Sequence, residues 1–224
     1  MILVVNCFLE DTLAAGFDQA VAGHLEGTGR PSRFLRWNQL EDLGDPAVYT
    51  HLIISGSVAT ATQVQPWDQA LGDLVRRFVD GRRPVLGICY GHQFLAKVLA
   101  GPDHVRRAPR PEFGFLELDL PPHPLFRGLT RPLMMVSHED EVFDLPGEFT
   151  VLASSPTCGV HAFQYRDLPV WGLQFHPEYS AVDGDKIWKE VFCCTPGRVP
   201  GPPAEPARMD QNRMIFHNFV GTGR

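Results

Sequence analysis

Short apolar runs alternate with segments of helical periodicity along the first hundred positions. Three unbroken runs, Ile2–Cys7, His51–Ile54 and Pro84–Ile88, are too short for helices and are typical of strands buried on both faces. A further short strand is predicted at Phe34–Trp37. Apolar residues recur at helical spacing in Leu13–Leu25, Trp67–Val79 and Gly91–Leu99. Alternating strands and helices predict a parallel sheet with helices on both faces.

The second half of the chain has a different pattern, in which strand-like segments are separated by turns that contain Pro and Gly. The predicted strands are Phe115–Leu120, Leu133–Val136, Thr150–Ser154, His161–Tyr165 and Val170–Gln174. We expect them to add partly antiparallel strands to the sheet. The segment 195–206 is rich in Pro and Gly and predicts a surface loop, and Met209–Val220 predicts a closing helix. Without a linker before position 180, the simplest organisation is one domain over residues 1–224.

Composition narrows the possible classes of partner. The 224 residues carry a formal net charge of −6 and no basic cluster, so nucleic acid is not an expected partner. The five cysteines form neither a disulfide framework nor a CxxC pair, which predicts reduced thiols. No run approaches the length of a transmembrane helix, and no basic segment precedes the first apolar run as in a signal peptide. These features predict a cytoplasmic protein that does not bind membranes.

Cys89 has the surroundings of a reactive nucleophile. It lies where a predicted strand passes into a helix, between Gly87 and Gly91. A side chain on such a sharp turn needs small neighbours two residues away on each side, so that strand and helix can approach. The helix also directs its N-terminal amides toward the sulfur and favours the thiolate. The pattern alone leaves open that Cys89 is an ordinary small core residue, since free cysteines are often buried.

His176 and Glu178 form a second candidate constellation. Pro177 disfavours the helical conformation for His176, and in an extended segment residues two apart face the same side. Glu178 can therefore orient the imidazole while its other nitrogen faces a thiol. A single histidine could equally be structural, but the pattern GxCxGxQ followed by FHPE favours a Cys, His and acid set.

Together these residues resemble the class I, or triad-type, glutamine amidotransferase domain, and the resemblance extends from the first strand to about Tyr179. It implies a flavodoxin-like, mostly parallel sheet with helices on both faces and added antiparallel strands. It also implies that a γ-glutamyl amide is cleaved through a thioester on Cys89, with His176 as general acid and base and Glu178 as its orienting partner. The implied substrate is a small molecule, glutamine or another γ-glutamyl compound.

The same resemblance suggests supporting residues around the triad. The backbone N–H groups of Ser57 and Tyr90 are expected to form an oxyanion hole, although many relatives have glycine at the position of Ser57. Substrate binding is expected at Gly56 and Gln93. It is also expected at Ser137 and His138, within a segment similar to that of GMP synthetase-like relatives.

The acidic residues that follow His138 allow other interpretations. Glu139, Asp140 and Glu141 suit either a solvated loop or a metal patch, but no other residues have metal-ligand spacing. The sequence therefore predicts no metal, and the hydrolysis of a γ-glutamyl amide requires no cofactor.

The fate of the released amine stays open, because the chain contains no P-loop and no second large domain for a synthetase. A free-standing amidotransferase-like hydrolase, a γ-glutamyl peptidase acting on glutathione-like conjugates and a glutaminase subunit docked on a synthetase all fit. A binding protein that keeps the fold without turnover is the non-enzymatic alternative.

Overall fold

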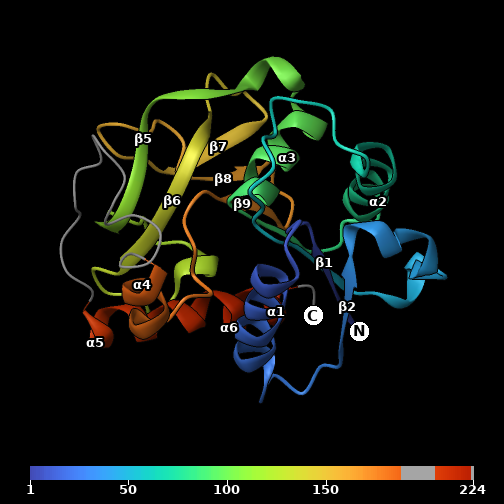
Figure 1. The fold of residues 1–224 in the computed structure, drawn as a ribbon, viewed down its shortest axis with the longest axis horizontal. Coiled ribbons are helices and arrows are strands. Elements are labelled where there is room, and N and C mark those ends of the chain that lie inside the picture. Colours follow the sequence, from blue (N-terminus) through green and yellow to red (C-terminus); the bar gives the residue numbers. More distant parts are fainter. Residues whose placement is uncertain (188–204, 223–224) are drawn as a thin grey trace.

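The computed structural model describes residues 1–187 and 205–222, and a seven-stranded sheet forms its centre (Figure 1). The strand order is β2-β1-β3-β4-β9-β8-β7. Neighbours from β2 to β9 are parallel, whereas β8 and β7 are antiparallel additions at one edge. The strands are β1 (Ile2–Asn6), β2 (Ser32–Arg36), β3 (His51–Ile54), β4 (Val85–Ile88), β7 (Phe149–Ala153), β8 (Ala162–Tyr165) and β9 (Val170–Leu173).

Helices cover the sheet on both sides because alternate residues of its central strands point to opposite faces. Ile2 and Val4 pack with α1 (Asp11–Leu25) and α6 (Arg213–Gly221) on one face. Leu3 and Val5 pack with α2 (Asp68–Asp80) and α3 (Tyr90–Leu99) on the other. Burial on both faces explains why these strands appear in the sequence as unbroken apolar runs. The predicted α/β fold with a mostly parallel sheet and added antiparallel strands is confirmed.

A separate antiparallel ribbon of β5 (Val105–Glu117) and β6 (Leu133–Val142) stands beside the main sheet (Figure 1). The predicted strand Leu133–Val136 therefore continues to Val142. Asp140 and Glu141 are buried within β6, where Arg106 and Arg107 of β5 pair with them. The interpretation of the acidic cluster as a solvated loop is wrong, because cross-strand arginines compensate the buried charges.

The closing helix predicted at Met209–Val220 is divided. Short α5 (Pro206–Met209) and a 3₁₀ turn (Asp210–Asn212) precede α6. The buried Asn212 amide donates a hydrogen bond to the Leu133 carbonyl at 3.0 Å, and this tie to the start of β6 interrupts the helix. Helix α4 (Ala181–Ile187) follows the last strand. Residues 195–204 of the predicted surface loop lie outside the described residues. Among the described residues, no helix is both long enough and apolar enough to cross a membrane.

Candidate active site

Cys89 lies at the carboxyl end of the parallel part of the sheet, directly between β4 and α3. Its backbone has φ 50° and ψ −101°, a positive-φ conformation that costs about 1–3 kcal/mol for a residue other than glycine. Its N–H donates a 2.7 Å hydrogen bond to the Leu173 carbonyl at the end of neighbouring β9. The strained turn is thus held by the adjacent strand, and it brings the Cys89 side chain to the N-terminus of α3.

The two glycines predicted to flank a nucleophile elbow are required by close backbone contacts. A Cβ added at Gly87 would lie well within 3.0 Å of the Gly91 carbonyl oxygen, and one added at Gly91 would lie 2.5 Å from that of Ile54. No real Cβ tolerates such distances. The sequence prediction that small residues are needed two positions before and after Cys89 is therefore in accord with the packing.

His176 is held by both its backbone and its ring. Its N–H donates to the Met135 carbonyl of β6 at 2.8 Å, and its Nδ1 lies 2.7 Å from Glu178 Oε1. Because a carboxylate can only accept, the proton of this contact belongs to Nδ1, which leaves Nε2 as the nitrogen available to a neighbouring thiol. Glu178 is fully buried, and its backbone carbonyl accepts a hydrogen bond from His24 Nε2 at 2.9 Å.

The charges around His176 favour its protonated form. Burial acts to lower the pKa of His176, but the Glu178 carboxylate and the Cys89 sulfur, which hydrogen-bonds the ring, together raise it well above its ordinary value. The Cys89 Sγ also lies 3.6 Å from the Ser137 carbonyl oxygen. Cysteine, imidazole and carboxylate are therefore connected in that order, as the sequence predicts.

A cavity of about 350 Å³ opens in front of these groups. Cys89, Gln93 and His176 contribute to its wall, together with residues of the loop after β3 and of β6. It carries one permanently cationic side chain, Arg107, among the described lining residues, and acidic side chains at Glu139 and Asp140. Its size and mixed charge suit a small zwitterionic molecule.

The loop after β3 passes close to Cys89 and His176. A Cβ on Gly56 would lie 3.2 Å from His176 Cε1 and 3.6 Å from Cys89 Cβ. The Ser57 hydroxyl donates to the Cys7 carbonyl at 2.7 Å and accepts from the Ala59 N–H at 3.0 Å, which fixes the loop. Ser57 lines the cavity, and among the described residues no hydrogen bond uses its backbone N–H.

Tyr90 contributes only its backbone to this region. Its N–H is the first of α3 and so has no acceptor within the helix. Its hydroxyl accepts a hydrogen bond from Trp67 Nε1 at 2.9 Å in the core below. The Tyr90 N–H therefore stays available beside Cys89.

The other predicted substrate-binding residues are placed in different ways. Gln93 is buried, and its Nε2 donates both to the Asp140 carbonyl at 2.9 Å and to Gln174 Oε1 at 3.0 Å. Ser137 faces the cavity. His138 reaches it through its backbone only, because its imidazole points to the opposite face of β6 and contacts Glu112 at 3.0 Å.

Three lining residues were not anticipated from the sequence. The Tyr179 ring lies 5.3 Å from the His176 ring, the Thr60 hydroxyl donates to Asp140 Oδ2 at 2.5 Å, and Arg107 pairs with Glu139 at 2.6 Å. Tyr179 follows the FHPE segment directly, so its position was a usable signal. Thr60 and Arg107 meet Asp140 only through tertiary packing.

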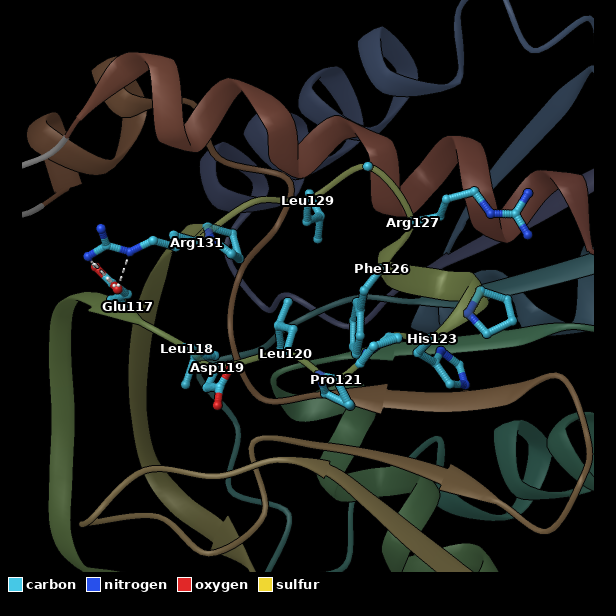
Figure 2. Close-up of a pocket in the computed structure, with 14 residues that line it drawn as sticks. Glu117, Leu118, Asp119, Leu120, Pro121, His123, Phe126, Arg127, Leu129 and Arg131 are labelled. Carbon is cyan, nitrogen blue, oxygen red and sulfur yellow. Dashed lines mark hydrogen bonds and ion pairs between the residues drawn. The ribbon is translucent and has the colours of Figure 1, made fainter.

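A wider pocket of about 900 Å³ lies elsewhere and shares no lining residue with the first (Figure 2). It is formed by the segment from Glu117 to Pro132, which is rich in proline and leucine. Its Glu117 and Arg131 form an ion pair at its edge (Figure 2). It contains no cysteine and no paired histidine and carboxylate, so the smaller cavity is the better candidate for chemistry.

Comparison with known sequences points to one family. Residues 13–193 match the model of the family described as "Glutamine amidotransferase class-I". The chain is 45% identical over 99 residues to the glutamine-hydrolysing subunit of GMP synthase from Pyrococcus abyssi, covering 43% of this chain and 52% of that protein. It is 42% identical over 112 residues to the corresponding protein from Methanothermobacter thermautotrophicus, covering 49% and 59%. The chain thus spans about half the length of the curated relatives it matches.

Solved structures agree on the fold over nearly the whole chain. A glutamine amidotransferase from Methylobacillus flagellatus matches with a TM-score of 0.75 at 20% identity, over 98% of this chain and 92% of that one. A glutamine amidotransferase from Thermotoga maritima matches with a TM-score of 0.72 at 19% identity, over 99% of both chains. At these identities the similarity establishes the architecture.

Proposed function

Since this chain belongs to the class I glutamine amidotransferase family, we propose that it hydrolyses a γ-glutamyl amide with Cys89 as nucleophile. The resemblance noted in the sequence is thereby confirmed at the level of the family. The observation that carries the proposal is the connection of the strained Cys89 to the His176–Glu178 pair at the wall of a cavity.

The first half of the reaction forms a thioester. The Cys89 thiolate attacks the δ-carbonyl carbon of the substrate, and the N–H groups of Ser57 and Tyr90 hold the oxyanion. The His176 imidazolium donates its proton to the leaving amine, so ammonia departs when the substrate is glutamine. Glu178 keeps His176 in the orientation and protonation state that this step needs, because its carboxylate accepts from Nδ1 at 2.7 Å.

The second half releases glutamate. His176, now neutral, removes a proton from a water molecule, and the resulting hydroxide attacks the thioester carbonyl. The Cys89 thiolate leaves, and His176 is again protonated. The cavity's Arg107 carries a charge opposite to an α-carboxylate, and Glu139 and Asp140 carry charges opposite to an α-ammonium group. We assign the two ends of the bound amino acid to these sides, near Gly56, Gln93, Ser137 and His138.

The relatives named as the glutamine-hydrolysing part of GMP synthase favour one specific setting. In that setting this chain supplies ammonia to a separate synthetase subunit, which would hold the ATP-dependent chemistry. We propose such a partner on the basis of this similarity. A free-standing hydrolase and a γ-glutamyl peptidase remain alternatives, because the same thioester chemistry accepts other leaving amines.

A direct assay separates these possibilities. The purified chain is given L-glutamine or glutathione, and the release of glutamate from each is measured beside a Cys89→Ala control. We expect Cys89-dependent turnover of glutamine that increases when a synthetase subunit is added. Turnover of glutathione in preference to glutamine would indicate a γ-glutamyl peptidase instead. Absence of Cys89-dependent turnover with either substrate, with and without a synthetase subunit, would contradict the proposed enzyme.

The pH profile tests the role of Glu178. In the active form Cys89 is a thiolate and His176 is protonated, and Glu178 raises the pKa of His176. Glu178→Gln removes this carboxylate, so His176 loses its proton at a lower pH. We expect the alkaline limb of kcat/KM to move to lower pH, and kcat to fall by roughly 10³–10⁴, as when other triads lose this carboxylate.

An exposed carboxylate provides the matched control for this variant. Glu117→Gln removes a surface charge in the wider pocket, distant from the cavity of Cys89. Its pH profile should coincide with that of the parent enzyme. An unchanged profile in Glu178→Gln would show that Glu178 does not set the protonation of His176.

A further inference from the structure

A second cluster of reactive side chains lies behind β6, on the face opposite the cavity. Glu112 of β5, His138 of β6, and Cys158 and His161 of the segment before β8 converge there. One potential ligand atom from each of the four lies within 4.8 Å of the others. His138, Cys158 and His161 are buried, and the Glu112 side chain is 11% exposed. The proposed hydrolysis uses none of these side chains.

The hydrogen bonds of His138 define what its inward nitrogen can be. Its Nδ1 lies 3.0 Å from the Asp140 carbonyl oxygen, which can only accept, so Nδ1 carries the proton. In the neutral ring, Nε2 then presents a lone pair. That lone pair points toward Glu112 Oε2 at 3.0 Å, which is itself an acceptor. Two facing acceptors need a positive species between them, either a proton or a metal ion.

His161 repeats the same conflict on the same oxygen. Its Nε2 lies 2.7 Å from Glu112 Oε2, but the contact lacks the geometry of a hydrogen bond, and Nδ1 also has no hydrogen-bond partner among the described residues. The ring is fully buried. If protons alone resolved the conflict, two buried imidazolium groups would share one carboxylate. That leaves an uncompensated buried positive charge, which is strongly unfavourable.

The remaining oxygen of Glu112 is supported from outside the cluster. The hydroxyl of Ser155 donates to Oε1 at 2.7 Å, and the Thr157 hydroxyl also contacts Oε1. Oε2 is therefore the oxygen turned inward. A carboxylate anchored by hydroxyls and a histidine that donates its other N–H to a backbone carbonyl are the usual outer contacts of metal ligands.

We propose that Glu112, His138, Cys158 and His161 bind one divalent zinc ion. A thiolate, two neutral imidazoles and one carboxylate are ligands that Zn²⁺ accepts in a four-coordinate site. The two negative ligands balance the charge of the ion, which resolves the conflict among the acceptors. Zn–N and Zn–S bonds of about 2.0–2.3 Å place tetrahedral ligand atoms roughly 3.3–3.8 Å apart, so the widest pair needs only a small inward shift.

The site would stiffen one wall of the catalytic cavity. His138 is adjacent to Ser137, whose carbonyl oxygen lies 3.6 Å from Cys89 Sγ. Because successive residues of a strand face opposite sides, a ligand on one face of β6 fixes the neighbour on the other. The ion therefore has a structural role, with four protein ligands and no open position for substrate. This inference is independent of the reaction assigned to Cys89.

Cobalt substitution tests the site directly. The protein is titrated with Co²⁺ and Zn²⁺ in a chain carrying Cys89→Ala, Cys193→Ala and Cys194→Ala, so that Cys7 and Cys158 are the remaining thiols. We expect one equivalent of Co²⁺ to give the intense visible bands of tetrahedral coordination and a sulfur-to-cobalt charge-transfer band. Zn²⁺ should displace it, and elemental analysis should give one zinc per chain.

Two ligand variants and one control complete the experiment. Cys158→Ser should abolish the charge-transfer band, and both it and His161→Gln should lower zinc affinity by at least about tenfold. Cys7→Ala removes the other buried thiol and should leave the spectrum and affinity unchanged. Weak octahedral absorption with no bound zinc in the parent chain would overturn the proposal in favour of a hydrogen-bonded network, even if a ligand variant fails to fold. A charge-transfer band that persists in Cys158→Ser would also overturn it.

Discussion

Replacing Cys89 by alanine is expected to lower kcat for glutamine hydrolysis by about 10⁴ or more, because thioester formation is lost entirely. Removing the nucleophile of a comparable triad has an effect of this order. Substrate binding should be nearly unchanged, since the cavity keeps its loop at Ser57 and its wall at Ser137. The measurement is glutamate release under saturating glutamine, together with the substrate affinity of the variant by calorimetry.

A thiol variant in the core provides the control for Cys89→Ala. Cys7 is fully buried, and burial raises the pKa of its thiol far above the ordinary value, so it is not expected to react as a thiolate. Cys7→Ala should retain turnover and should still be modified at Cys89 by a γ-glutamyl-directed electrophile. If Cys89→Ala kept the activity of the parent, the nucleophile would have to be another group and the proposed mechanism would be wrong.

Much of the candidate site could be predicted from the sequence because its main parts are local. The elbow needs Gly87, Cys89 and Gly91 within one strand-to-helix turn, and the orienting pair needs only His176 and Glu178 two residues apart. Their separate strands, β4 and β9, are neighbours with Ile88 opposite Leu173. A buried parallel sheet aligns the carboxyl ends of such strands, and this alignment brings the two local motifs together.

The rest of the site depends on packing that no local pattern indicates. Arg107 and Asp140 meet across the β5–β6 ribbon, and the length of that ribbon follows from buried charges that have arginine partners. The cluster proposed to bind zinc draws its four residues from positions 112, 138, 158 and 161, without the short spacing of familiar zinc motifs. The sequence therefore predicted no metal, although it placed His138 in the correct wall.

Gly91→Ala is expected to lower the free energy of unfolding by about 3 kcal/mol, the upper part of the range for overpacked substitutions. The added Cβ would lie 2.5 Å from the Ile54 carbonyl oxygen, so β3 and α3 must separate. Gly87→Ala meets the Gly91 backbone at least as closely and should cost a similar amount. Urea unfolding measures both effects through the midpoint at an unchanged m value.

An open glycine in α1 separates this packing effect from the general effect of replacing glycine. A methyl group added at Gly16 would have no atom within 4 Å, and the residue lies on an exposed turn in the interior of the helix. Gly16→Ala should therefore raise stability by about 0.5–1 kcal/mol, opposite in sign to Gly91→Ala. Because Gly91 donates its N–H to the Ser55 carbonyl at 3.0 Å, the strained variant should also displace the loop that carries Ser57 and lose activity. Equal unfolding midpoints for Gly91→Ala and Gly16→Ala would show that close packing at the elbow does not limit what can occupy position 91.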